Sequence, residues 1–236
     1  VGSYHLIESA RNAGVKHFVF SSTAAVYGEP EIVPIREDAP LHPTNVYGRT
    51  KLMIEEMLSD YSAIYGSTYV ALRYFNAAGA DESGDIGEDH SPETHLIPLV
   101  LEAALKKRPH ITVFGTDYDT ADGTCIRDYI HVTDLASAHV LAMNYLINGG
   151  ESRAFNLGSG NGFSVKDIIE TAKKVTEIDI PVEYGKRRAG DPSTLIASSD
   201  CIKNVLGWNP QHSELSHIIG DAWRWHQSHP MGYDDK

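Results

Sequence analysis

The pair of residues whose types and spacing most directly suggest chemistry in this sequence is Tyr47-x-x-x-Lys51. On a helix these two side chains lie one turn apart on the same face. An ammonium group beside a phenol favours the phenolate, which makes a tyrosine with an ordinary pKa of about 10 usable as a base. Lowering that pKa by about three units requires about 4 kcal/mol of differential stabilisation. Because the chain contains twelve tyrosines, a Tyr-x-x-x-Lys spacing can arise by chance and is weak support for a catalytic pair. The elements around the pair must show whether it lies in a site.

Helices and strands alternate around the pair, with short connections between them. The expected elements are a helix ending over 10–15 with Gly14 as its C-cap, a buried parallel strand over 18–20, a helix over 46–65 ending at Gly66, and a strand over 69–74. This order predicts the α/β class with a parallel sheet and right-handed connections.

The second half of the chain alternates less regularly. Helices are expected over 96–107, 134–147 with Asp134 as N-cap, 164–176 with a Ser164-x-x-Asp167 capping box, and 214–227; strands are expected over 112–114, 154–157 and 182–184. No low-complexity linker divides the chain, so we expect two packed subdomains, 1–76 and 77–236, with part of 127–158 returning to the first sheet.

Composition excludes several classes of function. The net charge of −12 argues against binding to nucleic acid, and no apolar run is long enough for a transmembrane helix. Two cysteines, Cys125 and Cys201, fit a reducing compartment and are expected to be inert buried thiols. The twelve histidines include no His-Glu-x-x-His and neither cysteine lies in a C-x-x-C pair, so no metal site is expected.

Polar residues follow each strand of the first half. Ser21, Ser22 and Thr23 stand at the carboxyl end of one strand, where open α/β sheets bind ligands, and Tyr74-Phe75-Asn76 ends the next. A hydroxyl loop, a Tyr-x-x-x-Lys helix and a Tyr-Phe-Asn strand end, in this order, resemble the active-site half of the extended short-chain dehydrogenase/reductase superfamily. Within it, four segments resemble the UDP-glucose 4-epimerase family: 18–28, 115–118, 122–132 and 187–192.

The resemblance implies interconversion of UDP-glucose and UDP-galactose, by oxidation at sugar C4 with NAD, rotation of the 4-ketose and re-reduction. Tyr47 is then the catalytic base, Thr23 hydrogen-bonds the same sugar oxygen, and Lys51 binds the nicotinamide ribose and lowers the pKa of Tyr47. The implied cofactor contacts are Ser21, Tyr47, Lys51, Tyr74 and Phe75.

The resemblance also implies how the sugar nucleotide is held. Arg127 and Arg188 match diphosphate-binding arginines, Asp191 matches a ribose-binding acid, and Leu195 matches the residue that limits room beside the sugar C2 substituent. The remaining implied substrate contacts are Thr23, Asn76, His95, Leu96, Thr112 and Phe114. With a leucine at 195, weak turnover of the N-acetylated sugar pair is expected beside the main activity.

The resemblance implies a role for each subdomain, and an oligomeric state and a location for the protein. Residues 1–76 become the C-terminal part of an NAD-binding Rossmann domain, and 77–236 become mainly the UDP-sugar-binding subdomain. A cytoplasmic homodimer that packs through helices including the Tyr47 helix is implied as well.

The family's N-terminal Gly-rich βαβ segment has no counterpart in the sequence, so roughly 90–100 residues are expected to precede Val1. We expect the chain to be inactive without that segment. Two alternatives stay open: another nucleotide-sugar enzyme of the same branch, a dehydratase or a decarboxylase, and a non-catalytic nucleotide-sugar-binding fragment. Dehydratases of this branch carry Asp-Glu directly after the threonine, where this chain has Ala24 and Ala25, which cannot transfer protons.

Overall fold

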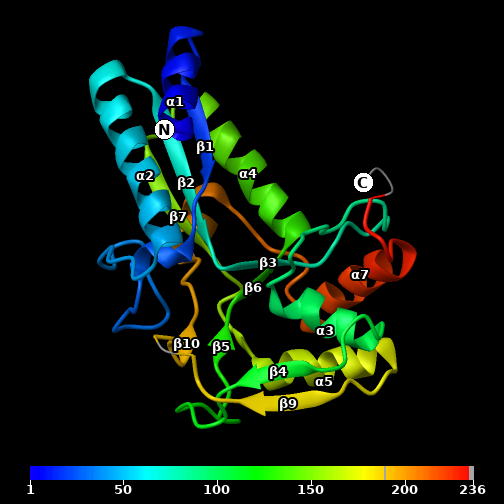
Figure 1. The fold of residues 1–236 in the computed structure, drawn as a ribbon. Helices are drawn as coiled ribbons and strands as arrows, with labels where there is room; N and C mark the ends of the chain where they lie inside the picture. Colours follow the sequence, from blue (N-terminus) through cyan, green and yellow to red (C-terminus); the bar gives the residue numbers. More distant parts are fainter. Residues whose placement is uncertain (189, 234–236) are drawn as a thin grey trace. The chain divides into compact units, whose positions relative to one another are not determined.

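The computed structural model describes residues 1–188 and 190–233, which form two compact units (Figure 1). The first unit contains Val1–Phe75, Leu135–Gly160 and Ala197–Asn209. The second contains Asn76–Asp134, Asn161–Ile196 and the described residues from Pro210 on, with residue 189 left out. The chain therefore returns to the first unit twice, and the second return, at Ala197–Asn209, was not predicted from the sequence. Among the described residues, no helix is both long and apolar enough to cross a bilayer.

A three-stranded sheet with the order β1-β2-β7 lies at the centre of the first unit, within the described residues, and its parallel pairing confirms the prediction. Its strands are β1 (His17–Ser21), β2 (Thr68–Tyr74) and β7 (Arg153–Leu157); its helices are α1 (Gly2–Asn12), the 3-10 helix η1 (Ala24–Tyr27), α2 (Val46–Tyr65), α4 (Val132–Ile147) and α6 (Asp200–Leu206). Leu72, Phe155 and Leu157 are fully buried in this sheet. Phe18, Val19 and Phe20 were expected to be buried but are half-buried, because β1 pairs on one side only within the described residues.

Helix α2 has the predicted bounds, and local chemistry sets both of its ends. The Asn45 side chain caps the first turn by accepting a hydrogen bond from Gly48 N at 2.8 Å. Gly66 ends the helix in the left-handed conformation at φ +71°, which glycine adopts without steric cost. A Cβ atom at Gly48 would lie 2.4 Å from the Ala25 carbonyl oxygen, so glycine is what allows α2 to approach η1.

The described residues of the second unit combine short strand sets with helices around an apolar core. Its strands form the sets β10-β5-β8, β3-β6 and β4-β9. Their bounds are β3 (Asn76–Ala78), β4 (Ile111–Phe114), β5 (Ile126–Arg127), β6 (Tyr129–His131), β8 (Phe163–Ser164), β9 (Val182–Gly185) and β10 (Thr194–Leu195); the helices are α3 (Leu96–Ala104), α5 (Val165–Thr176) and α7 (Leu215–Ser228). Val100, Leu101, Ile168 and Ile218 are fully buried in the core between these helices.

Three predicted helix ends differ from the structure. Helix α3 ends at Ala104, not 107, and Lys106 adopts a positive φ of 60°. Helix α1 has Ala13 as its C-cap, with Gly14 one residue beyond in a left-handed conformation. Asp134 is not an N-cap: it lies in the first turn of α4, where its carboxylate accepts hydrogen bonds from the backbone N–H groups of Gln211 and His212. The Ser164–Asp167 capping box is confirmed.

Candidate active site

The first unit places Tyr47 and Lys51 together at the start of α2. The Lys51 ammonium lies 5.7 Å from the centre of the Tyr47 ring and donates a hydrogen bond to the Ser21 carbonyl oxygen at 2.9 Å. Partial burial lowers the pKa of Lys51 below its ordinary value. The Tyr47 side chain is open to a ligand, since the residue is 55% exposed. The helix therefore presents a phenol and a cation on one accessible face.

Thr23 lies at the carboxyl end of β1, where it is buried and caps η1. Its Oγ1 accepts a hydrogen bond from Ala25 N at 3.1 Å, so the hydroxyl hydrogen remains to be donated. Ser21, at the end of the same strand, bonds His139 Nε2 at 2.8 Å. His139 Nδ1 faces the Leu135 carbonyl at 2.8 Å and must carry the proton, so Ser21 is the donor to Nε2. The Tyr74 ring packs edge-on against His139.

A buried polar network, which was not predicted from the sequence, lies beside these residues and joins α2, β2 and the end of β1. Glu55 on α2 forms a bidentate ion pair with Arg73 on β2, with the shortest N–O distance 2.6 Å, and accepts a hydrogen bond from Ser22. Burial would lower the pKa of Arg73, but hydrogen bonds and charge interactions with Glu55 and Tyr27 together outweigh this effect and raise it. Arg73 also donates to the Tyr27 hydroxyl at 2.9 Å. The sequence contained a sign of this pair, since Glu55 lies on the inner face of the predicted helix and Arg73 lies within an apolar strand.

A cavity of about 600 Å³ in the second unit collects most of the residues predicted to bind the sugar nucleotide. Those that line it are Asn76, His95, Leu96, Thr112, Phe114, Arg127, Arg188 and Asp191. Leu195 is not among the described residues that line this cavity; it pairs with Arg127 across β10 and β5. The lining residues that the sequence did not single out as site residues are Glu93, Thr94, Leu99, Arg108, Ile111, Cys125, Tyr129 and Val165.

Two of the arginines that line the cavity, Arg127 and Arg188, were predicted from the sequence to bind phosphate; Arg108 lines it as well. Arg127 donates to the Ile126 carbonyl at 2.7 Å and forms an ion pair with Asp191, so the acid and the base hold each other in place. The Arg188 guanidinium lies 4.1 Å from the centre of the Phe114 ring. Planar guanidinium groups suit phosphate oxygens, and a ring on the cavity wall suits a flat heterocycle.

The neighbouring Arg187 has a different environment. It pairs with Asp117 at 2.7 Å, lies over the Tyr118 ring and is not a lining residue of the cavity. Ala189, which belongs to the same predicted segment, lies outside the described residues. Of the two adjacent arginines, Arg188 therefore lines the cavity and Arg187 lies on the surface away from it.

The two cysteines differ in their surroundings. Cys125 is buried at the cavity, and burial raises the pKa of its thiol, as expected for an inert cysteine. Cys201 was expected to be buried but is half-buried, and its sulfur accepts a hydrogen bond from Arg153 at 2.9 Å. Partial burial nevertheless raises the pKa of the Cys201 thiol as well.

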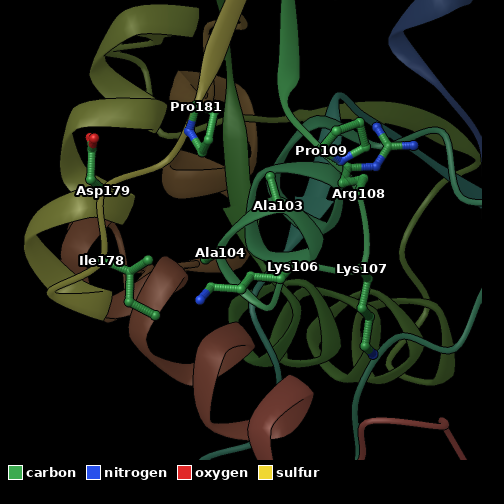
Figure 2. Close-up of a pocket in the computed structure, with 9 residues that line it drawn as sticks. All are labelled: Ala103, Ala104, Lys106, Lys107, Arg108, Pro109, Ile178, Asp179 and Pro181. Carbon is green, nitrogen blue, oxygen red and sulfur yellow. The ribbon is translucent and has the colours of Figure 1, made fainter.

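A second cavity, of about 490 Å³, lies beyond the end of α3 (Figure 2). Lys106, Lys107 and Arg108 come from the segment that follows α3, and Ile178, Asp179 and Pro181 from the segment that follows α5. None of its lining residues was predicted to act in a site, and its lining carries no catalytic pairing like that of Tyr47 with Lys51.

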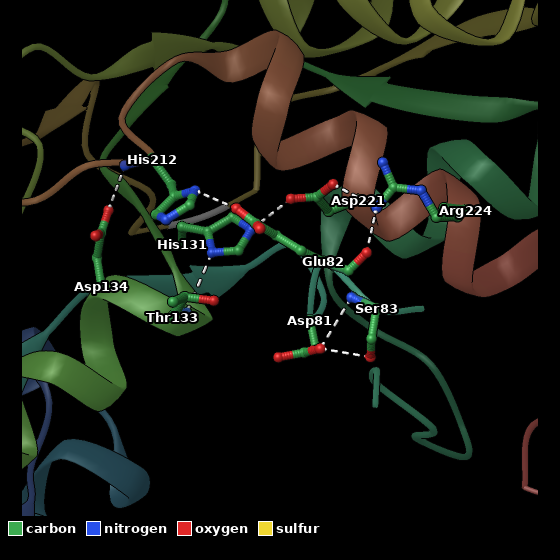
Figure 3. A network of polar contacts seen from close by, with 9 residues as sticks. All are labelled: Asp81, Glu82, Ser83, His131, Thr133, Asp134, His212, Asp221 and Arg224. Atoms are coloured by element: carbon green, nitrogen blue, oxygen red, sulfur yellow. Dashed lines mark hydrogen bonds and ion pairs between the residues drawn. The ribbon is translucent and has the colours of Figure 1, made fainter. Parts of the chain in front are cut away.

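Histidines form a further polar network in the second unit (Figure 3). His131 Nδ1 accepts a hydrogen bond from Thr133 N at 3.1 Å, so its Nε2 carries the proton that is donated to Asp221 at 3.2 Å. His212 stacks on His131, with ring centres 4.8 Å apart. Burial and the neighbouring His212 lower the pKa of His131. The network ties β6 to α7 through a neutral imidazole.

Comparisons with known proteins identify the relatives of this chain. Residues 1–158 match the model of the NAD dependent epimerase/dehydratase family. A UDP-glucose 4-epimerase of Halalkalibacterium halodurans is 54% identical over 99% of this chain and 70% of its own length. A crystal structure of UDP-glucose 4-epimerase matches with a TM-score of 0.97 at 54% identity, over 99% of this chain and 71% of that one. A UDP-glucose-4-epimerase from Stenotrophomonas maltophila, with bound NAD and formylated UDP-arabinopyranose, matches with a TM-score of 0.93 at 40% identity, over 97% and 68%.

Proposed function

We infer that this chain, which belongs to the NAD dependent epimerase/dehydratase family, acts as a UDP-glucose 4-epimerase that interconverts UDP-glucose and UDP-galactose with NAD as its cofactor. The observation that carries the inference is the cavity of the second unit, where Arg127, Arg188 and Asp191 stand beside Phe114. These groups offer cations for a diphosphate, an acid for ribose hydroxyls and a ring for a base.

In this proposal the residues of the first unit perform the acid–base chemistry. Tyr47, as phenolate, removes the proton from the sugar 4-hydroxyl, and Thr23 donates a hydrogen bond to the same oxygen. Lys51 stabilises the phenolate through its charge. A bound NAD would supply the acceptor for the C4 hydride and the donor for its return, and Tyr47 would give its proton back to the sugar oxygen as the ketose is reduced.

The first unit carries groups that fit such a cofactor. Within the described residues, the Lys51 ammonium has one hydrogen bond, to Ser21 O, so two of its three donors remain for the hydroxyls of a nicotinamide ribose. Ser21, Tyr74 and Phe75 stand at the carboxyl ends of β1 and β2, the edge of a parallel sheet where dinucleotides bind. We assign Ser21, Tyr47, Lys51, Tyr74 and Phe75 to the cofactor.

The second unit holds the UDP part of the substrate in this proposal. Arg127 and Arg188 bind the diphosphate and Asp191 the ribose; Asn76, His95, Leu96, Thr112 and Phe114 complete the contacts. Placing most binding energy on UDP leaves the 4-ketose free to turn over between the two hydride transfers. Leu195 is assigned to the wall beside C2, where its intermediate volume would admit an N-acetyl group poorly.

We further propose a homodimer that packs through α2 and acts in the cytoplasm. Helix α2 exposes Met53, Ile64 and Tyr65, which supports an apolar partner surface on this helix. Sedimentation equilibrium of the purified protein tests the dimer, and a Met53→Lys/Ile64→Lys double variant is expected to shift it toward the monomer.

Product analysis tests the reaction itself. Incubation of the full-length enzyme with UDP-galactose and NAD is expected to give UDP-glucose. NMR of the sugar ring follows the conversion. A 4-keto-6-deoxy product or released carbon dioxide would instead indicate a dehydratase or a decarboxylase. The side chains of Ala24 and Ala25, directly after Thr23, lack the acid and base that elimination of water requires.

A further inference from the structure

The loop before α3 brings two imidazoles and two carboxylates to one point. They belong to Glu88, His90, Glu93 and His95, and their nearest ligand atoms all lie within 4.8 Å of one another. His95 Nδ1 is 2.8 Å from Glu88 Oε1 and 2.9 Å from Glu93 Oε1, and His90 Nδ1 is 3.4 Å from the same Glu93 oxygen. Both rings therefore direct Nδ1 at one carboxylate.

Glu93 is the fixed centre of this cluster. Its side chain is 7% exposed, and Oε1 accepts hydrogen bonds from the backbone N–H groups of Thr94 at 2.6 Å and His95 at 2.7 Å. These bonds hold the carboxylate against the loop and fix its orientation. The cluster is thus centred on an oriented, largely buried oxygen ligand.

The ligand types in this cluster favour a cation among these groups. Two carboxylate oxygens and two imidazole nitrogens converge here, and each is a type of ligand that a divalent metal ion accepts. One divalent cation satisfies all four groups at once.

We propose that Glu88, His90, Glu93 and His95 form a four-ligand site for Zn²⁺. Imidazole nitrogen and carboxylate oxygen are ligands that Zn²⁺ takes in tetrahedral sites, with bonds of about 2.0–2.2 Å. Because all four residues come from one loop of eight residues, the ion closes the loop directly before α3. Glu93 and His95 also line the cavity of the second unit, so the ion fixes one rim of that cavity.

Sequence motifs predicted no metal site in this chain. The spacing Glu-x-His-x-x-Glu-x-His differs from the helical His-Glu-x-x-His and the Cys-x-x-Cys signatures. The other cluster of this kind among the described residues, His131, His212 and Asp221, is a weaker candidate. Both nitrogens of His131 are already engaged, with Thr133 and Asp221.

Metal binding to the purified full-length protein tests the site without reference to activity. After removal of metal with a chelator, isothermal titration with ZnCl₂ is expected to show one tight equivalent per chain. His90→Gln, at an exposed position, is expected to weaken this binding at least about 100-fold, since loss of an outer-shell partner alone costs roughly 10–100-fold. His110→Gln, from the isolated His110–Glu183 pair, is the matched control and should bind as the parent does.

X-ray absorption at the zinc edge gives a readout that does not depend on any variant. Four nitrogen and oxygen ligands at about 2.0–2.1 Å support the site. Absence of a tight equivalent, sulfur ligation, or binding that persists in His90→Gln and disappears in His212→Gln would each overturn the proposal. Unchanged circular dichroism and melting temperature of metal-free His90→Gln exclude misfolding as the cause of lost binding.

Discussion

Tyr47 is an exposed phenol next to a half-buried ammonium, and this contrast assigns their roles. Lys51 donates a hydrogen bond to Ser21 O, and this bond fixes the position of its ammonium group. A ligand can reach the phenol oxygen directly. In the proposed mechanism the accessible tyrosine exchanges a proton with the substrate, and the lysine places a positive charge beside it.

Tyr47→Phe in the full-length enzyme removes the proton acceptor and leaves the ring. We expect kcat for UDP-galactose to fall at least about 100-fold, the lower range for loss of a general base. The dissociation constant for UDP should change little, because the residues proposed to bind UDP lie in the other unit. Steady-state kinetics and UDP titration measure both quantities; a near-normal kcat would show that another group is the base.

Adjacent arginines 187 and 188 offer a matched pair for the proposed diphosphate site. Arg188→Met is expected to weaken UDP binding roughly 10- to 150-fold, which corresponds to the loss of about 1.5–3 kcal/mol from charged hydrogen bonds. Arg187→Met should have little effect, since Arg187 pairs with Asp117 away from the cavity. Calorimetric titration with UDP compares them, and equal losses in both variants would argue against a specific contact at Arg188.

At the scale of elements, the Glu55–Arg73 pair joins α2 to β2 and so supports the start of α2 that carries Tyr47. Glu55→Gln leaves a buried arginine without its counter-ion. We expect the free energy of unfolding to fall by about 3–5 kcal/mol. Arg36→Met, from the exposed Arg36–Asp38 pair, should cost less than about 1 kcal/mol. Urea denaturation measures both; a similar small loss in the two variants would refute the bracing role.

The long helices and parallel strands could be predicted because each carries its own local signal. For α2, the apolar spacing, Asn45 and Gly66 agree, and the predicted bounds match the structure. Two-residue strands such as β5, β8 and β10 carry no period that can be counted, since contacts with distant segments define them. The end of α3 was misplaced for a similar reason: Lys106 turns to positive φ inside a sequence with good helix propensity.

The candidate site residues also divide into those that a local pattern could predict and those that only the fold brings together. Tyr47 and Lys51 could be paired from helix geometry alone. Arg127 and Asp191 are 64 residues apart, and only the family resemblance assigned them to one substrate site; their contact with each other was not predicted. Glu55, His139 and the loop cluster around Glu93 were missed, because single polar residues carry no spacing signal until the fold brings them together.

At the scale of the whole molecule, buried neutral histidines predict a pH dependence of stability. Burial, with His212 nearby, lowers the pKa of folded His131, so the unfolded chain, with an ordinary value near 6.5, takes up its proton first as pH falls. The free energy of unfolding should therefore decrease from pH 7 to 5.5. His131→Gln, whose amide can replace both hydrogen bonds, should reduce that slope, while His226, whose pKa burial also lowers, keeps part of it. Urea denaturation at pH 7 and pH 5.5 measures the change in the free energy of unfolding for both proteins. The same change in His131→Gln as in the parent would contradict a role for His131.

The central claim is that one hydride leaves C4 of the sugar and returns to the same carbon, with Tyr47 handling only the hydroxyl proton. UDP-galactose labelled with deuterium at C4 and converted by the full-length enzyme in ordinary water tests it most directly. We predict that the product UDP-glucose retains the deuterium at C4, as measured by mass spectrometry and NMR. Replacement of the label by solvent hydrogen would show that the carbon-bound hydrogen is removed as a proton, and would contradict the account.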